Sequence, residues 1–286
     1  MTAQDVLRRM PVAYPLQRMA VCSPSGNTTA VIFGQVRSAD RRVLNEAIMR
    51  SWAANPDQAE IEQCCFLIRP AGNGAIARVE MFGGEFCGNA ARSAAWLVTG
   101  GRDCSGLIDV SGAGRLLGFR VARGQVTAEM PLPDEDPPSM VEEGILVRLN
   151  GIAHVVVTDP GRREAMTSRQ LLESLIATDK YGLAGQPAAG VSYYDSGTSR
   201  AAFSVWVNRV GTFFDETACG SGSCAIGVAA AAAARGAIRL PVRQPSGEII
   251  ETFAGYDPAR RRPVSPAITG GVKVLYDGGF VAVAAE

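Results

Sequence analysis

Lysine and histidine are scarce in this chain of 286 residues. Lys180 and Lys273 are the only lysines among 28 basic residues, and His154 is the only histidine. Basic and acidic residues balance at 28 each, so the formal net charge is zero. Because proteins that bind nucleic acid are normally basic, we expect no nucleic-acid partner.

Long apolar segments are also absent. The longest run, residues 224–234, is too short and too rich in alanine to span a bilayer. Residues 1–10 are polar with mixed charge and do not match a secretory signal. The seven cysteines form no Cys-x-x-Cys pair and no pair with the spacing of a zinc site. We therefore expect a cytoplasmic protein with reduced thiols, no membrane partner and no metal.

The apolar content is sufficient for one or two packed cores. The chain is 47% hydrophobic and 20% charged, which excludes a disordered protein, and its length predicts about two domains. Helical spacing predicts helices at residues 41–52, 90–98, 168–177 and 225–235. Short apolar or alternating runs predict strands at residues 31–36, 64–69, 75–81, 107–110, 115–121, 125–130, 144–149, 154–158, 202–207, 249–253, 272–275 and 280–284. The proline-rich, acidic residues 131–138 are a predicted linker between two similar halves.

Two related segments stand out, GGEFCGNAARS at residues 83–93 and DETACGSGSCA at residues 215–225. Each places a cysteine and a glycine before a predicted helix of small residues. A helix N-terminus presents unpaired N–H groups and a positive dipole end, which favour a thiolate and can hold a carboxylate. If the turns face each other, Cys87 and Cys219 lie on opposite sides of one α-carbon, a geometry suited to removing and returning a proton. Two buried cysteines that precede glycine by chance are the simpler alternative.

These motifs resemble those of the diaminopimelate epimerase superfamily, which contains cofactor-independent amino-acid racemases. CGNAAR at residues 87–92 matches its first cysteine motif, and ACGSG at residues 218–222 matches its second. Further matches are SGN at 25–27, EQ at 62–63, His154 before an apolar strand, RQPSG at 243–247 and TGG at 269–271. The resemblance therefore extends over nearly the whole chain.

The resemblance implies an α+β fold of two similar domains, each a barrel-like β-sheet around a central helix. The N-terminal domain would comprise residues 1–138 and carry Cys87, and the C-terminal domain would comprise residues 139–271 and carry Cys219. In the family the last strand returns to the first domain, so we expect residues 272–286 to join it. The active site would lie in the cleft between the domains. The assembly stays open, with a homodimer among the options.

The same resemblance implies a role for each site residue. Cys87 and Cys219 would act as acid and base without pyridoxal phosphate or any other cofactor, and neither lysine lies in a site motif. The residues expected to bind a small amino-acid substrate are Asn27, Gln63, Gly88, Asn89, His154, Glu216, Gly220 and Ser221. Those at the two helix starts would bind its α-carboxylate through their backbone amides.

Several residues depart from the diaminopimelate epimerases themselves. The Glu-Arg pair of those enzymes is replaced here by VGTFF at residues 210–214, and Ile152 and Val191 occupy other positions that contact the distal half of diaminopimelate. PSGN at 24–27, EFCGNA at 85–90 and CGSG at 219–222 instead resemble the histidine racemases of staphylopine-type metallophore biosynthesis. The resemblance to that branch implies conversion of L-histidine to D-histidine for a nicotianamine-like metallophore.

A flat side chain would need aromatic or apolar walls, for which the candidates are Tyr193, Tyr194, Phe213 and Phe214. An epimerase of diaminopimelate, or a racemase of another diamino acid, is the next alternative. A non-catalytic amino-acid-binding module is a further one, and the presence of both cysteines argues against it. A thiol redox protein is the last, and the absence of a Cys-x-x-Cys pair argues against that.

Overall fold

The computed structural model describes residues 13–283 apart from 35, 38, 39, 56, 73 and 210. Predictions that involve residues 1–10, 35, 210 and 284 therefore lie outside the described residues. The strands are β1 (Ala13–Pro24), β2 (Thr29–Phe33), β3 (Gln63–Ile68), β4 (Arg78–Met81), β5 (Cys104–Val110), β6 (Leu117–Ala122), β7 (Gln125–Glu129), β8 (Ser139–Met140), β9 (Ile145–Leu149), β10 (Ile152–Val157), β11 (Ala188–Asp195), β12 (Arg200–Val207), β13 (Thr212–Asp215), β14 (Ile238–Arg243), β15 (Ile249–Asp257) and β16 (Arg262–Val283). The helices are α2 (Arg41–Ala53), α3 (Gly88–Thr99), α4 (Pro160–Ala165), α5 (Ser168–Ala177) and α6 (Gly220–Ala234), with a 3-10 turn, η2 (Lys180–Gly182). No helix in this described part of the chain is long and apolar enough to cross a membrane.

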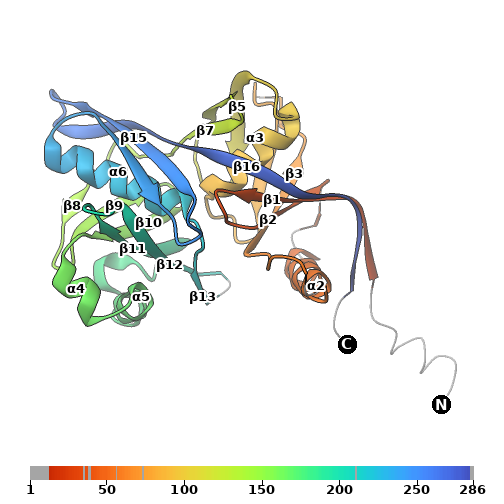
Figure 1. Cartoon of the computed structure of the whole chain (residues 1–286), viewed down its shortest axis with the longest axis horizontal. Coiled ribbons are helices and arrows are strands. Elements are labelled where there is room, and N and C mark those ends of the chain that lie inside the picture. The colour runs from red at the N-terminus through yellow and green to blue at the C-terminus, as the bar shows by residue number, and fades with distance from the viewer. Residues whose placement is uncertain are drawn as a thin grey trace, which may run out of the picture.

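The first half of the chain forms a closed barrel, so the expected α+β class is confirmed. β1 to β7 lie beside one another in chain order, and β16 pairs with both β7 and β1, which closes a ring of eight strands. α3 contacts strands around this ring, from β1 and β2 to β7 and β16. We call β1–β7 with α2 and α3 the N-terminal lobe, and it forms the right-hand part of Figure 1.

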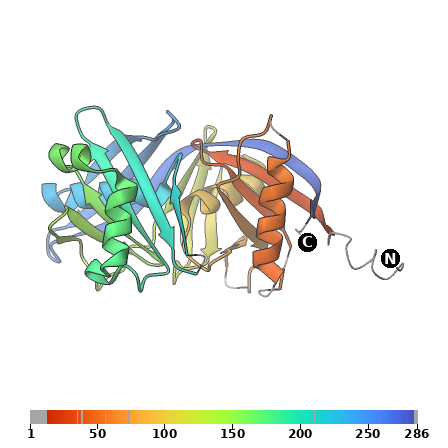
Figure 2. The ribbon, with the colours of Figure 1, turned by 90° about the horizontal axis from the view of Figure 1, so that it is seen from below.

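β8–β15 with α4–α6 form a second group, which we call the C-terminal lobe. The sheet continues from β16 through β15, β14, β12, β11, β10 and β9 to β8, with β13 beside β12. α6 contacts β9–β11 and β14–β16, and α5 contacts β11 and β12. β16 serves both lobes, because residues 262–269 pair with β15 and residues 272–283 pair with β1. Figure 2 shows the two lobes side by side with β16 crossing both.

The predicted domain boundary near residue 138 stays a prediction. Residues 131–138 contain no helix or strand, as expected for a linker. One hydrophobic cluster nevertheless joins the lobes and includes both Ala90 of α3 and Ala225 of α6. The starts of these two helices are therefore held against each other by a shared core.

The outer helices confirm the helical spacing of the sequence. α2 contacts β16 and shares a hydrophobic cluster with residues of β1, β2 and β3; its buried residues are Leu44, Ala47, Ile48 and Trp52. Val43 was expected on the buried face of α2 and is instead 42% exposed. α5 has the bounds predicted for it and buries three leucines against β11 and β12.

Other boundaries differ from the predictions for physical reasons. α3 begins at Gly88 instead of residue 90, and α6 begins at Gly220 instead of residue 225, because the preceding cysteine caps each helix. β16 is one strand where two were predicted, since the glycines inside it interrupt its apolar pattern. β1, β8, β11, β13, β14 and α4 were not predicted. β11 is buried on both faces, so it lacks the alternation of a half-buried strand.

Candidate active site

Each of the two cysteines caps a helix. Cys87 precedes α3 with an extended backbone, and its Sγ accepts the N–H of Ala90 at 3.4 Å. Cys219 precedes α6 in the same way, and its Sγ accepts the N–H of Gly222 at 3.3 Å. The sulfur thus occupies the position of the usual N-cap oxygen. Such a contact favours the thiolate, because a charged acceptor forms the stronger hydrogen bond.

Both thiols line one cavity of about 50 Å³ where the lobes meet. Its wall contains these residues expected in the site: Gln63, Cys87, Gly88, Asn89, Glu216, Cys219, Gly220 and Ser221. The rest of the wall is Met81, Glu85, Phe86, Ile152, Ala188, Val205 and Val207, which sequence reasoning did not place there as wall residues. Within the described residues, no group of three or more His, Cys, Asp or Glu is arranged to hold a metal ion.

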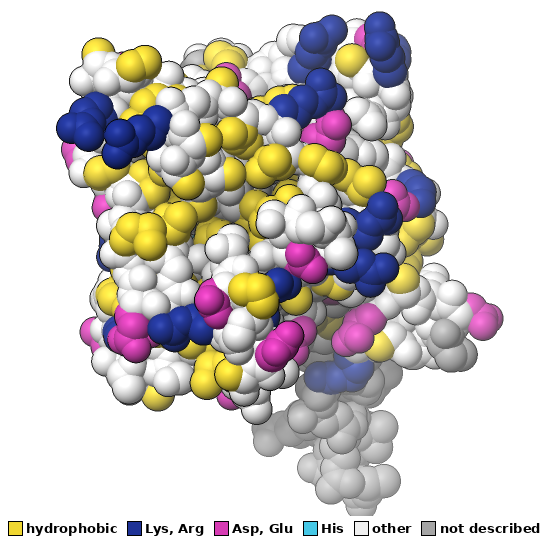
Figure 3. All heavy atoms as spheres, turned by 60° about the vertical axis from the view of Figure 1, so that its left-hand side comes forward, with side chains coloured by type: hydrophobic (Ala, Val, Ile, Leu, Met, Phe, Trp, Pro, Cys, Tyr) yellow, Lys and Arg dark blue, Asp and Glu magenta, His cyan; other side chains and the backbone are white. Residues whose placement is uncertain are grey.

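Asn27 and His154 lie behind this wall. Asn27 Oδ1 accepts from Gln63 Nε2 at 2.6 Å, and Asn27 Nδ2 donates to Glu216 Oε2 at 3.3 Å. His154 is fully buried, and its Nε2 lies 2.9 Å from the Ser221 hydroxyl oxygen. Figure 3 accordingly shows no histidine on the face that it presents. Each of the two residues contacts a side chain of the wall, and their expected contact with a substrate stays a prediction.

Gln63, the first residue of β3, is oriented by its neighbours toward Cys87. Its Nε2 donates to Asn27 Oδ1 at 2.6 Å and to the Thr29 hydroxyl at 3.0 Å. The amide oxygen therefore points the other way and lies 3.2 Å from Cys87 Sγ. Since a carbonyl oxygen can only accept, this contact is a hydrogen bond from the thiol of Cys87.

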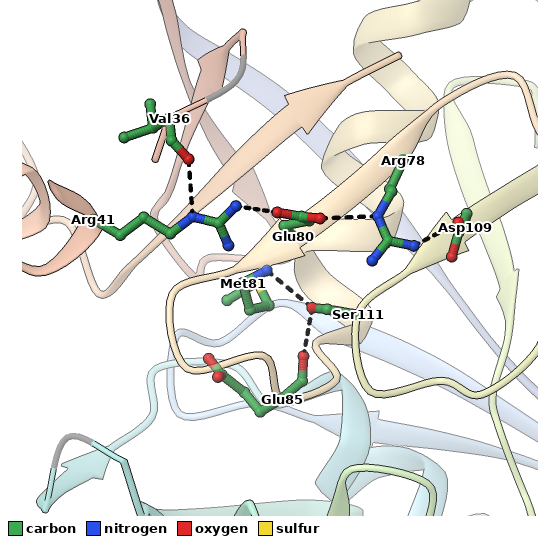
Figure 4. A network of polar contacts seen from close by, with 8 residues as sticks. All are labelled: Val36, Arg41, Arg78, Glu80, Met81, Glu85, Asp109 and Ser111. Carbon is green, nitrogen blue, oxygen red and sulfur yellow. Dashed lines mark hydrogen bonds and ion pairs between the residues drawn. The ribbon is translucent and has the colours of Figure 1, made fainter. Parts of the chain in front are cut away.

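The turn that leads to Cys87 is held by Ser111 at the end of β5. The Ser111 hydroxyl donates to the Glu85 carbonyl at 2.8 Å and accepts from the Met81 N–H at 2.9 Å (Figure 4). In the same view, Arg78 bridges Glu80 at 2.9 Å and Asp109 at 2.7 Å, which ties β4 to β5. The strands beneath the turn are thus fixed relative to each other.

Gln244 holds the second cysteine turn. The Cys219 N–H donates to Gln244 Oε1 at 2.9 Å, and Gln244 Nε2 donates to the Ser223 hydroxyl at 3.0 Å. That hydroxyl donates to the Cys219 carbonyl at 2.6 Å and closes the loop of contacts. Sequence reasoning quoted Gln244 within the RQPSG motif but assigned it no role, and its position in that motif was the only signal.

Hydrogen bonds also join the two turns across the lobes. Asn89 Nδ2 donates to the Ala218 carbonyl at 2.8 Å, directly before Cys219. The Thr217 N–H donates to Glu62 Oε2 at 3.1 Å, and the Thr217 hydroxyl donates to the same carboxylate. The residues before Cys219 are therefore positioned by groups of the N-terminal lobe.

Arg92 is a fully buried cation beside the first turn. Its guanidinium donates to Asn89 Oδ1 at 2.8 Å, to the Ser25 hydroxyl at 3.0 Å and to the Pro24 carbonyl at 3.3 Å. All three acceptors are neutral. Burial lowers the pKa of Arg92 to about 10, while the nearby Cys87 acts in the opposite direction. Arg92 thereby fixes the side-chain amide of Asn89, which in turn reaches Ala218.

Burial dominates the protonation of the site. It raises the pKa of Cys87 to about 12, and it raises the pKa of Cys219 as well. Burial, with a smaller effect of Glu62, raises the pKa of Glu216 to about 8. It lowers the pKa of His154 to about 3. At neutral pH, Glu216 is therefore mainly an uncharged acid and His154 an uncharged imidazole.

The aromatic walls expected from the sequence lie elsewhere. Phe213 packs on Trp206 with ring centroids 6.3 Å apart, and the Tyr193 hydroxyl donates to the Met166 carbonyl at 3.0 Å. Neither of these residues lines the cavity, nor do Tyr194 and Phe214. Phe86 is the aromatic residue of the wall, because it belongs to the turn that carries Cys87.

Comparisons with known proteins identify a family and several proteins of similar fold. Residues 18–279 match the family model described as the histidine racemase CntK N-terminal domain. The chain is 27% identical over 223 residues to a histidine racemase of Fusobacterium nucleatum subsp. nucleatum, a match that covers 72% of this chain and 77% of that protein. A hydroxyproline epimerase from Agrobacterium vitis, solved with trans-4-hydroxy-L-proline, has a similar fold with a TM-score of 0.60, 16% identity and coverage of 93% and 92%. A PhzF-family phenazine biosynthesis protein from Bacillus anthracis has a TM-score of 0.62, 10% identity and coverage of 94% and 99%.

Proposed function

The chain belongs to the histidine racemase family, and on this premise we propose that it interconverts L- and D-histidine with Cys87 and Cys219 as its two proton-transfer groups. That the protein is an isomerase of the amino-acid racemase and epimerase class follows from the family itself. The observation that carries the finer proposal is the pair of helix-capping thiols in the wall of one cavity.

In the proposed reaction, one cysteine thiolate removes the α-proton of the bound amino acid. The other cysteine, as a thiol, donates a proton to the opposite face of the same carbon. Atoms and charge balance, because one sulfur gains the proton that the substrate loses and the other gives up the proton that it receives. The two sulfurs therefore exchange roles when the opposite enantiomer is the substrate.

The carbanion needs stabilisation because an α-hydrogen of an amino acid is very weakly acidic. Both helices begin at the cavity wall, and we propose that the N–H groups of their first residues donate to a bound α-carboxylate from either side. The residues that would donate are Gly88, Asn89, Gly220 and Ser221. The hydrogen bonds from these donors would become stronger as negative charge moves onto the carboxylate. We therefore propose that catalysis needs no cofactor.

Histidine suits the rest of the wall. Ile152, Val205 and Val207 are apolar and give no partner to a second ammonium and carboxylate. An unpaired charge in such a place is costly, so a diamino acid would be rejected there. Phe86 supplies an aromatic surface for a planar ring, and the uncharged Glu216 supplies a hydrogen-bonding group.

One observation favours a second candidate, epimerisation of diaminopimelate or of another diamino acid. Glu85 lies in the cavity wall, and the charge of Arg209 lowers the pKa of its carboxyl group, against the larger raising effect of burial. The Glu85 carboxyl group would match the distal ammonium of such a substrate, whereas the exposed Arg209 does not line the cavity.

The test is incubation of the purified protein with L-histidine, L-ornithine and LL-diaminopimelate, followed by chiral chromatography. We expect kcat/KM for L-histidine at least about 100-fold above that for LL-diaminopimelate, because one missing partner for a buried charge is worth on the order of 3 kcal/mol. Activity should survive EDTA, and the spectrum should lack pyridoxal absorbance. Preferred turnover of diaminopimelate would favour the second candidate.

The domain organisation, the cellular location and the use of the product are inferred from the sequence resemblance alone. We propose that each lobe is a domain around its central helix, α3 or α6, and that the enzyme works in the cytoplasm, where thiols stay reduced. The same resemblance supports D-histidine as a building block of a nicotianamine-like metallophore. A gene neighbour that condenses an amino acid with an aminobutyrate unit would support that destination.

A further inference from the structure

The two sulfurs have different second partners. Beyond its helix N–H, Cys87 Sγ faces Gln63 Oε1 at 3.2 Å, an atom that cannot donate. Cys219 Sγ faces the Ser221 hydroxyl at 3.5 Å, which can donate or accept. The first contact is attractive only when Cys87 is a thiol, whereas the second also suits a thiolate.

The orientation of Gln63 is determined by a chain of contacts that begins at a carboxylate. Glu62 accepts from the backbone N–H groups of Thr28 and Thr217, each at 3.1 Å, and also from Asn27 Nδ2 at 3.1 Å. Asn27 Oδ1 must then be the atom that accepts from Gln63 Nε2 at 2.6 Å. If the side-chain amide of Gln63 were rotated by 180°, its oxygen would lie 2.6 Å from Asn27 Oδ1, and neither oxygen could donate. The Gln63 oxygen must therefore face Cys87.

On the other side, a relay runs from Cys219 through Ser221 to His154 and Ser192. His154 Nε2 lies 2.9 Å from Ser221 Oγ, and His154 Nδ1 lies 3.1 Å from Ser192 Oγ. The imidazole is uncharged, so exactly one of its nitrogens can donate. If Cys219 is a thiolate, Ser221 donates to it, Nε2–H donates to Ser221, and Ser192 donates to Nδ1. If Cys219 is a thiol that donates to Ser221, every hydrogen bond of the relay reverses its direction. Ser221 then donates to Nε2, and the imidazole proton lies on Nδ1.

We propose that the substrate-free enzyme carries its proton on Cys87 and its thiolate on Cys219, and that the tautomer of His154 reports the protonation state of Cys219 through Ser221. This assignment rests on the proposed two-thiol function. Gln63 retains the proton on Cys87, and the Gly222 N–H and the Ser221 hydroxyl both donate to the Cys219 thiolate.

Ionisable groups on every side of the sulfurs bear on this assignment. Glu216 acts on both thiols, Glu85 acts on Cys87, and the buried thiol of Cys65 lies near Cys87. In its charged form, each of the three would disfavour a thiolate next to it. The charge of Arg92 acts in the other direction and favours a thiolate on Cys87. Burial raises the pKa of both thiols and is the largest influence on each, so the assignment rests on the direct contacts in which the two sulfurs differ.

Proton balance follows directly. In the first turnover the α-proton passes to the Cys219 thiolate, and the Cys87 thiol gives its proton to the opposite face of the carbon. The enzyme is left with a thiol at Cys219 and a thiolate at Cys87 that faces the Gln63 oxygen. Turnover of the opposite enantiomer, or proton exchange with water, restores the resting state.

The single histidine of the chain makes the test direct. In substrate-free protein with a 15N-labelled imidazole, we expect Nε2 to be the N–H nitrogen and Nδ1 the bare nitrogen. Cys219→Ser replaces a thiolate, which can only accept, with a hydroxyl that can also donate to Ser221, so the fraction of His154 with its proton on Nδ1 should rise. Cys87→Ser is the matched control and should keep the wild-type tautomer. A wild-type protein with its proton on Nδ1, an imidazolium, or a tautomer unchanged by Cys219→Ser would overturn the proposal.

Alkylation by iodoacetamide at neutral pH, followed by peptide mass spectrometry, gives an independent measurement. Cys219 should react at least several-fold faster than Cys87, although it is 3% exposed and Cys87 is the more exposed of the two. Ser221→Ala should reduce that ratio. Equal labelling, or faster labelling of Cys87, would count against the assignment.

These results are separable from the function itself. If both cysteine variants lose racemisation while the tautomer or labelling result is the wrong one, the two-thiol mechanism stands and only the proton assignment fails. If either cysteine variant racemises at a rate close to wild type, the proposed function fails whatever the tautomer.

Discussion

The starts of α3 and α6 are built alike but lie in different surroundings. Both begin at a glycine after a capping cysteine, and both sulfurs accept one helix N–H at 3.3 to 3.4 Å. Around α3 the supporting groups are a carboxamide and the buried cation of Arg92. Around α6 a carboxamide, that of Gln244, holds the Cys219 backbone, while the sulfur itself faces a hydroxyl backed by the uncharged imidazole of His154. The proposed mechanism needs one thiol and one thiolate at any moment, and two similar turns would acquire that difference from their neighbours.

The largest expected effect is the loss of activity when either cysteine sulfur is removed. Cys87→Ser and Cys219→Ser should each reduce racemisation of histidine by about 1,000-fold or more, because a serine hydroxyl is far too weakly acidic to replace a thiol as acid or base. Chiral chromatography measures the rate, and circular dichroism checks the fold. Cys104→Ser, at an exposed cysteine, is the matched control and should keep full activity.

The buried imidazole beside α6 should make the fold sensitive to acid. The folded pKa of His154 is about 3 against an ordinary value of 6.5. Between these values the unfolded chain binds a proton that the folded chain does not, so stability is lost as the pH falls from about 6.5 toward 3. The slope is at most about 1.4 kcal/mol per pH unit.

Urea unfolding of the wild type and of His154→Gln at pH 7 and pH 4.5 measures this effect. The variant should be less stable at pH 7 but should lose less stability on acidification. Glu216 has the opposite sign, because its pKa is raised to about 8 and its contribution is lost as the pH rises from about 4.5 to 8. Equal slopes for wild type and His154→Gln would rule out His154 as a source of acid sensitivity.

Among the residues that the structure describes, no buried cation contacts the start of α6 as Arg92 contacts that of α3. Arg92→Met removes donors to Asn89, Ser25 and Pro24 and leaves their oxygens unpaired, so we expect a loss of about 3 kcal/mol in the free energy of unfolding. Arg92→Lys should recover only part of it, because an ammonium cannot reproduce the guanidinium fork. Arg102→Met, at the exposed end of the same helix, should change stability by less than about 0.5 kcal/mol.

The smallest expected effect is the difference in stability between alanine substitutions of Gly88 and Gly220. A Cβ on Gly220 would lie 2.9 Å from Ile268 and 3.2 Å from Asn89 Oδ1, whereas one on Gly88 would meet the flexible ends of Ile268 at 3.1 Å and Met130 at 3.2 Å. We expect Gly220→Ala to cost about 1–2 kcal/mol of stability and Gly88→Ala less. Gly220→Ala should also raise KM, because Asn89 would shift. Thermal unfolding ranks the two, and an equal cost would show that Asn89 yields as readily as Met130.

Local patterns in the sequence were sufficient for several features of the fold and site. The spacing of apolar residues predicted α2 and α5 closely. The Cys-Gly motifs predicted that a helix follows each cysteine, although the predicted starts were two and five residues too late. The six elements that were not predicted are each short, buried on both faces, or interrupted by proline or glycine. β11 shows why, since every residue but its last is buried and no alternation remains to be detected.

The site residues also fall into those that the sequence predicted and those that only the structure revealed. The cysteines, the glycines after them and Gln63 belong to motifs that a single sequence displays, and the structure brings them to one cavity. Val205 and Val207 entered the wall only through folding, because strands far apart in the chain meet there. Phe86 lies in a quoted motif and Ile152 at a position noted for substrate contact, but neither was predicted as a wall residue. The aromatic residues near Cys219 in sequence do not line the cavity, since those strands direct them elsewhere.

The sequence by itself determined that two cysteines would each begin a helix, because a small capping residue followed by glycine and a run of small side chains favours that local structure. Only the tertiary structure decided which groups surround each sulfur. Gln63 is 24 positions from Cys87, and His154 is 67 positions from Ser221, so no local pattern relates them. The difference between the two thiols arises from contacts distant in sequence, and these exist only after the barrel closes and β16 joins the lobes.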